Sequence, residues 1–134
     1  MFSWLLSGAL AEEAAETAAQ AEPTWFENAV KKREGEQLLA RIRPSDYVIA
    51  LTIEGTMRDS EELSRHLTQL TVQGRSSIVF VIGGSLGLSE EVVQRADEQL
   101  SMSRMTFPHQ LARVMLYEQV YRAMKIASGE RYHK

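Results

Sequence analysis

Three glycines, Gly83, Gly84 and Gly87, lie close together directly after the apolar run Ile78-Val79-Phe80-Val81-Ile82. Glycine has no Cβ, so its backbone can approach a ligand closely. The spacing is not the G-x-G-x-x-G of a dinucleotide site, and no Gly-Lys-Ser/Thr follows as in a P-loop. Taken alone, the loop indicates a tight strand-to-helix turn, and a ligand site at the end of the strand is the alternative.

Side chains near the C-terminus could perform a second kind of chemistry. Arg122 lies in a helical pattern, and Tyr132, His133 and Lys134 end the chain. Arginine carries a fixed positive charge and tyrosine an aromatic ring. Taken alone, these residues indicate a surface arginine and a frayed tail. The role of His109 stays open, and a structural hydrogen bond is favoured for it.

Metal and disulfide chemistry have no support in the sequence. The three histidines are far apart, without the paired spacing of metal ligands, and the chain has no cysteine. We therefore predict neither a metal site nor a disulfide. The lack of cysteine fits a reducing compartment, and the predicted location is the cytoplasm.

Composition and charge are those of one folded domain. The chain has 134 residues, of which 44% are hydrophobic and 25% charged. Its formal net charge of −3 does not by itself indicate a nucleic-acid partner. Acids outnumber bases in residues 1–40, however, and bases outnumber acids in residues 99–134. The basic C-terminal third could contact phosphate, and a solvated helix face is the alternative.

The elements that must position these residues alternate between apolar runs and helical patterns. Near-continuous apolar runs at 46–53 and 77–82 predict strands that are buried on both faces, as in a parallel sheet. A shorter strand is predicted at 102–107, ended by Pro108. The fold class is therefore α/β with a parallel sheet.

Helical patterns precede and follow these runs. A capping box opens a helix at 24–43, Asp59 or Ser60 caps the next, and a third is predicted at 90–100. The last helix, at 108–127, is apolar on more than one side. It needs two covering neighbours, which we take to be the sheet and the same helix of a second subunit. The predicted assembly is a homodimer.

Several motifs of the C-terminal part occur in a fixed order. They are Phe80-Val81-Ile82-Gly83-Gly84-Ser85-x-Gly87-Leu88, Ser101-x-Ser103-x-Met105-Thr106-Phe107-Pro108-His109-Gln110, Arg113-Val114, Glu118-Gln119-Val120-Tyr121-Arg122-Ala123 and Tyr132-His133-Lys134. Together they resemble the RlmH family, and the resemblance runs from about Lys32 to the end of the chain. Proteins of that family are small SPOUT methyltransferases, which methylate N3 of a pseudouridine in 23S ribosomal RNA with S-adenosylmethionine.

The resemblance implies a fold, a cofactor, a partner and a set of site residues. The implied fold is a SPOUT fold with a C-terminal trefoil knot, and the implied partner is 23S ribosomal RNA within the ribosome. The implied cofactor-binding residues are Leu51, Gly83, Met102, Ser103, Arg104, Met105, Thr106 and Phe107. The implied catalytic residues are Arg122, Tyr132 and His133. We also expect Gly83→Val to block the cofactor while leaving the fold largely intact.

The N-terminal region departs from the family. Residues 1–23 form an atypical Ala/Glu-rich segment before a methyltransferase domain at 24–134, and the family's opening strand is apparently missing. No basic residue precedes the first apolar residues, and the run is too short for a membrane span. One edge of the sheet would be exposed unless the apolar residues 2–6 pack on it. A non-catalytic RNA- or ribosome-binding relative is therefore the alternative function.

Overall fold

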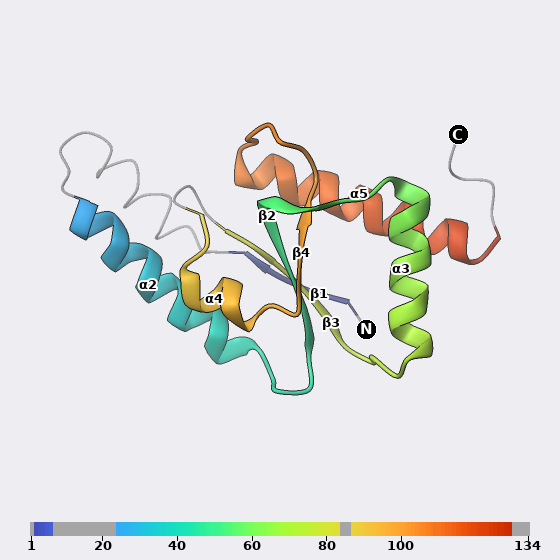
Figure 1. Cartoon of the computed structure of the whole chain (residues 1–134), viewed down its shortest axis with the longest axis horizontal. Helices are drawn as coiled ribbons and strands as arrows, with labels where there is room; N and C mark the ends of the chain where they lie inside the picture. The colour runs from blue at the N-terminus through green and yellow to red at the C-terminus, as the bar shows by residue number, and fades with distance from the viewer. Residues whose placement is uncertain (1, 7–23, 84–86, 130–134) are drawn as a thin grey trace.

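The computed structural model describes residues 2–6, 24–83 and 87–129, of which 2–6, 24 and 25 are described by their backbone alone. The elements are, in chain order, β1 (Phe2–Leu6), α2 (Thr24–Arg41), β2 (Tyr47–Met57), α3 (Ser60–Val72), β3 (Ile78–Ile82), α4 (Glu90–Arg95), β4 (Glu98–Ser101) and α5 (His109–Ala127). The four strands form one parallel sheet in the order β1-β3-β2-β4 (Figure 1). The predicted α/β class with a parallel sheet is confirmed.

Helices cover both faces of this sheet. In Figure 1, α2 and α4 lie on one side of the strands and α3 and α5 on the other. A hydrophobic core lies on each face of the sheet, and strand β3 contributes residues to both. Phe80 packs with residues of α3 and α5, whereas Val79 and Val81 pack with residues of α2 and α4. All five residues of β3 are buried. The prediction of a central strand with two buried faces is therefore confirmed.

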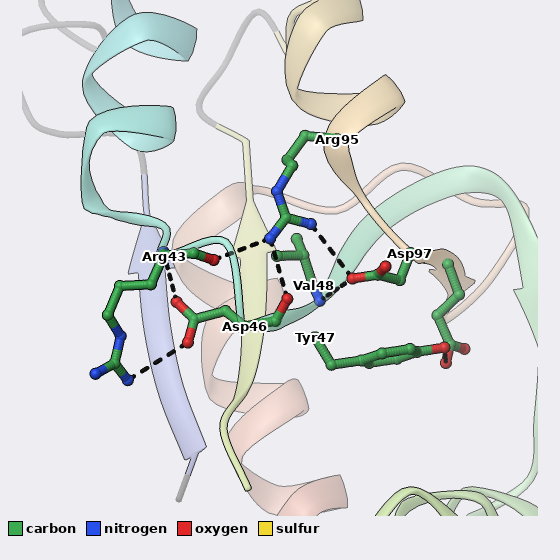
Figure 2. A network of polar contacts seen from close by, with 7 residues as sticks. Arg43, Asp46, Tyr47, Val48, Arg95 and Asp97 are labelled. Carbon is green, nitrogen blue, oxygen red and sulfur yellow. Dashed lines mark hydrogen bonds and ion pairs between the residues drawn. The ribbon is translucent and has the colours of Figure 1, made fainter. Parts of the chain in front are cut away.

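A polar network joins the amino ends of β2 and β4 (Figure 2). Nη2 of Arg95 donates to the carbonyl oxygens of Arg43 and Asp46, at 3.0 Å each. The backbone amide of Arg43 donates to Oδ2 of Asp46 at 2.8 Å, and this bond to the charged form lowers the pKa of that carboxyl. The network holds the turn between α2 and β2 against the start of β4.

The predicted helix at 90–100 is wrong in its second half. Helix α4 ends at Arg95, because Ala96 already has an extended backbone with φ −62° and ψ 137°. Asp97 then hydrogen-bonds to Val48 of β2, and β4 follows. The hydrogen bonds of the sheet outweigh the helical preference of this segment. The predicted strand at 102–107 is also wrong, because the strand lies four residues earlier and 102–107 form a loop.

The N-terminal edge differs from the prediction as well. Strand β1 pairs in parallel with β3, from Phe2 opposite Ile78 to Leu6 opposite Ile82. The expectation of a missing edge strand is therefore wrong, and the expectation that residues 2–6 pack on the sheet is confirmed for their backbone. The Ala/Glu-rich part of the predicted atypical segment, 7–23, lies outside the described residues. The trefoil knot stays a prediction. None of the described helices has the length and apolar content that a bilayer crossing requires.

Candidate cofactor site

Strand β2 contains a wide bulge at its carboxyl end. Leu51 and Thr56 both pair with Leu100 of β4, so residues 52–55 lie outside the ladder. At Gly55 a Cβ would lie 2.7 Å from two backbone carbonyl carbons of β4, which no side chain tolerates. Glycine therefore allows the bulge to press against β4. The bulge turns residues 52–54 toward the end of the sheet where parallel α/β folds bind ligands.

The loop after β3 also depends on glycine. A Cβ on Gly83 would lie 2.7 Å from the carbonyl carbon of Gly87 and 3.0 Å from the amide nitrogen of Leu88. The backbone of Gly87 and Leu88 therefore lies directly beside Gly83. Any side chain at this position would displace the neighbouring backbone locally, and the expectation that Gly83→Val leaves the fold largely intact stays a prediction.

Between the bulge, this loop and the start of α5 lies a cavity of about 340 Å³. Its lining residues are Leu51, Thr52, Ile53, Glu54, Ile82, Gly83, Gly87, Leu88, Val93, Gln99, Met102, Ser103, Met105, Thr106, Phe107, His109 and Ala112. The size lies within the range of about 300–1,000 Å³ that is typical of small-molecule sites, and the walls are mainly apolar with a few polar groups. The cavity thus has the form of a ligand site.

Most of the predicted cofactor-binding residues line this one cavity. They are Leu51, Gly83, Met102, Ser103, Met105, Thr106 and Phe107. The exception is Arg104, which is exposed and is not among the lining residues. His109, whose role the sequence left open, lines the cavity at the start of α5. Leu51, Gly83 and the loop at 102–107, which are far apart in the sequence, therefore lie around one cavity. Their contact with a cofactor stays a prediction.

The loop at 102–107 is held by local hydrogen bonds. The hydroxyl of Ser101 donates to the carbonyl oxygen of Ser103 at 3.1 Å, and the amide of Met105 donates to the hydroxyl of Ser103 at 3.0 Å. Met105 lines the cavity although its side chain is 70% exposed. The run that suggested a strand here is therefore a loop, and its apolar residues Met102, Met105 and Phe107 line the cavity.

Sequence reasoning missed the residues of the bulge and their partner on β4. Thr52 donates from Oγ1 to Oε1 of Gln99 at 2.9 Å, and both residues line the cavity beside Glu54. The sequence Glu54-Gly55 was interpreted as the end of the strand. Met57, which continues the strand after Gly55, was the available signal.

The predicted catalytic residues do not reach the cavity within one described chain. Arg122 follows Ala112 by ten residues on α5, a separation of about 15 Å along the helix axis. Its Nε lies 2.9 Å from Oε1 of Glu118. Tyr132 and His133 lie outside the described residues. The described part of the chain contains no group of three or more His, Cys, Asp or Glu side chains that could hold a metal ion.

Helix α5 presents two apolar faces, as predicted. Ala112, Leu116, Val120 and Ala123 are buried, and the last three belong to the core shared with α3. The opposite face exposes large apolar side chains, namely Leu111, Val114, Tyr121 and Met124. We call these four residues the outer face of α5. No described residue of the chain covers them fully.

The sequence of the chain is similar to those of known methyltransferases. A family model described as "Predicted SPOUT methyltransferase" matches residues 6–133. The chain is 59% identical over 105 residues to "Ribosomal RNA large subunit methyltransferase H" of Shouchella clausii and of Bacillus pumilus, and 55% identical to that of Clostridioides difficile. Each match covers 78% of this chain and 66% of the relative, so the chain spans just under two thirds of these relatives. The chain belongs to the SPOUT methyltransferase family, and the resemblance found in its motifs is confirmed.

Proposed function

We propose that this protein methylates N3 of a pseudouridine in 23S ribosomal RNA, within the ribosome and with S-adenosylmethionine as the methyl donor. One observation carries the proposal: Leu51, Gly83 and the loop at 102–107 line a single cavity at the carboxyl ends of β2 and β3. The names of the relatives support ribosomal RNA as the substrate.

The residues of the cavity suit an adenosyl group. Leu51, Met102 and Phe107 offer apolar walls for a flat base, and the close backbone approach at Gly83 leaves peptide groups at the cavity wall. When bound, S-adenosylmethionine supplies a methyl group on a positively charged sulfur. The work of the chain is then to fix the donor in one orientation and to exclude water from its apolar part.

The substrate side of the site requires a second subunit in this proposal. Arg122 lies about 15 Å along α5 from the cavity, and the outer face of α5 is exposed. Pairing of two chains through these outer faces would bring Arg122 and the Tyr132-His133 tail of one subunit toward the cavity of the other. There the guanidinium would stabilise an anionic base, and Tyr132 would stack on it.

The non-catalytic alternative rests on the atypical N-terminal region of the sequence. Strand β1 occupies the edge of the sheet that was expected to lack a strand, and residues 7–23 lie outside the described residues. The bulge of β2 is formed, and Gly83 lines the cavity. We therefore retain the methyltransferase as the proposed function.

Two successive measurements test the proposal, the first of cofactor binding and the second of RNA methylation. Calorimetry should show binding of S-adenosylmethionine, and the absence of binding at millimolar ligand would refute a cofactor site. Mass mapping of ribosomal RNA from cells that lack and then regain the gene should show one methylated pseudouridine lost and restored. An unchanged methylation pattern would favour the non-catalytic alternative.

A further inference from the structure

Glu54 occupies a distinctive electrostatic position. Among the cavity-lining residues that the structure describes, it is the only Asp, Glu, Lys or Arg. The other polar lining side chains are those of Thr52, Gln99, Ser103, Thr106 and His109. Within the described residues, no hydrogen bond or ion pair engages the carboxylate of Glu54. The cavity therefore has a negative charge that is not neutralised by a described neighbour.

The position of this charge is set by the bulge of β2. Gly55 presses the bulge against the backbone of β4, and the hydrogen bond from Thr52 to Gln99 ties its other end to the same strand. Glu54 lies between these two attachments. Its backbone is therefore held at the cavity, although its side chain is exposed.

The proposed reaction changes the charge of the ligand. The S–CH3 bond breaks with its electron pair left on sulfur, the N–CH3 bond forms, and the proton of the acceptor nitrogen passes to solvent. S-adenosylmethionine has a net charge of +1 at neutral pH, and its thioether product S-adenosylhomocysteine has none. A carboxylate at the cavity attracts S-adenosylmethionine more strongly than S-adenosylhomocysteine.

We propose that Glu54 is a specificity-determining residue that favours the charged sulfonium ligand over its neutral thioether product. This inference rests on the proposed function, since it concerns the same cavity. The carboxylate is solvent-exposed, so water screens its charge and the preference is moderate. We expect it to contribute about threefold to tenfold to the affinity ratio of the two ligands. In the cell, such a preference would promote release of the product and entry of a new donor.

Titration calorimetry with both ligands tests this inference without an activity assay. Glu54→Gln keeps the shape of the side chain and removes its charge, so the affinity for S-adenosylmethionine should fall about threefold to tenfold. The affinity for S-adenosylhomocysteine should change less than about twofold, because that ligand has no net charge. Glu54→Asp keeps the charge and should preserve most of the ratio. Glu36→Gln, on the exposed surface of α2, removes a charge elsewhere and should leave the ratio unchanged.

The outcomes separate this inference from the proposed function. If the wild-type protein binds neither ligand, the cofactor proposal fails. If both ligands bind and Glu54→Gln leaves their ratio unchanged, or if Glu36→Gln lowers it equally, the assignment to Glu54 is overturned while the cofactor site stands. Thermal unfolding of each variant, compared with that of the wild type, shows whether a lost affinity reflects a lost fold.

Discussion

The backbone amide of Val48 donates to the carboxylate of Asp97 at 2.7 Å, and the amide of Asp97 donates back to the carbonyl oxygen of Val48 at 2.8 Å (Figure 2). This reciprocal pair lies immediately before β4 begins. Nη1 of Arg95 lies 3.3 Å from the same carboxylate, so its charge is partly compensated. The pairing of β4 with β2 therefore starts from a fixed point at the amino end of the sheet, away from the cavity.

Asp97→Ala should destabilise the fold, because it leaves the amide of Val48 without its acceptor. Hydrogen bonds to charged groups contribute about 1.5–3 kcal/mol, so we expect a loss of that order in the free energy of unfolding. Urea denaturation measures it. Asp97→Asn retains an oxygen acceptor and should lose less. An equal loss of unfolding free energy in both variants would mean that the charge of Asp97, rather than its hydrogen bond to Val48, stabilises the fold.

Gly55→Ala should displace the bulge from β4. Its Cβ would meet backbone atoms at 2.7 Å, and backbone cannot rotate away as a side chain can. Overpacking of this kind costs about 1–3 kcal/mol, and the displaced bulge should also weaken cofactor binding. Gly74→Ala is the matched control: Gly74 has φ +92° and no atom within 4 Å of its Cβ position, so only backbone strain is added. The control should lose stability without losing affinity.

Much of the fold could be predicted because the apolar pattern within single elements already shows which residues are buried. The run Ile78–Ile82 is buried on both faces, and the stripe of Leu63, Leu67 and Leu70 packs α3 on the sheet. Each pattern can be recognised from the spacing of apolar residues within a single strand or helix. The end of α4 could not be predicted in this way, because Asp97 leaves the helix to bond with a residue 49 positions earlier. That competition is decided by tertiary contacts.

The candidate site was predictable only in part. Leu51, Gly83 and five residues of the loop at 102–107 were found through family motifs, and they converge as expected. The bulge that carries Glu54 could not be found by periodicity, because Glu54-Gly55 interrupts the apolar run and looks like its end, although β2 continues to Met57. Arg122 was assigned through the family, and its separation of about 15 Å along α5 from Ala112 at the cavity shows that a motif alone does not place a residue relative to the site.

Val114→Glu should disrupt the proposed homodimer. Val114 lies on the outer face of α5 with 61% of its side chain exposed, so the substitution is tolerated by the folded chain. Within an interface, an unpaired charge should weaken association by at least about tenfold. Light scattering over a dilution series measures the effect. Val72→Glu, at an 81% exposed site on α3, is the control and should not change the mass. A wild-type protein that is already monomeric would contradict the proposal.

Arg122→Ala should separate substrate binding from cofactor binding. The residue lies far from the cavity of its own chain, so affinity for S-adenosylmethionine should stay within about twofold of wild type. Methylation of ribosomes should fall at least about tenfold if the guanidinium stabilises the base. Arg33→Ala, on the exposed surface of α2, controls for the loss of a positive charge. Unchanged turnover in Arg122→Ala would remove this residue from the site.

Stability at alkaline pH should depend on Tyr47. Burial and the hydrogen bond that its hydroxyl donates to Oε1 of Glu98, at 2.8 Å, raise the pKa of Tyr47 to about 12. In the unfolded chain the same phenol ionises near its ordinary value of about 10. Its stabilising contribution is therefore complete below pH 10 and is lost as the pH rises toward 12. Tyr47→Phe should remove this part of the alkaline loss, which unfolding titrations at pH 9 and pH 11.5 would measure.

The parallel pairing of β1 with β3 has a consequence for biosynthesis. β1 leaves the ribosome before the other described elements, yet Phe2 can pair only after Ile78 has been translated, and Leu6 only after Ile82. Closing so long a loop in an unstructured chain costs entropy, and the cost falls once β2, α3 and β3 have formed a compact unit. Strand β1 is thus among the last of the described elements to dock, and until then its backbone groups are open to other partners, including chaperones.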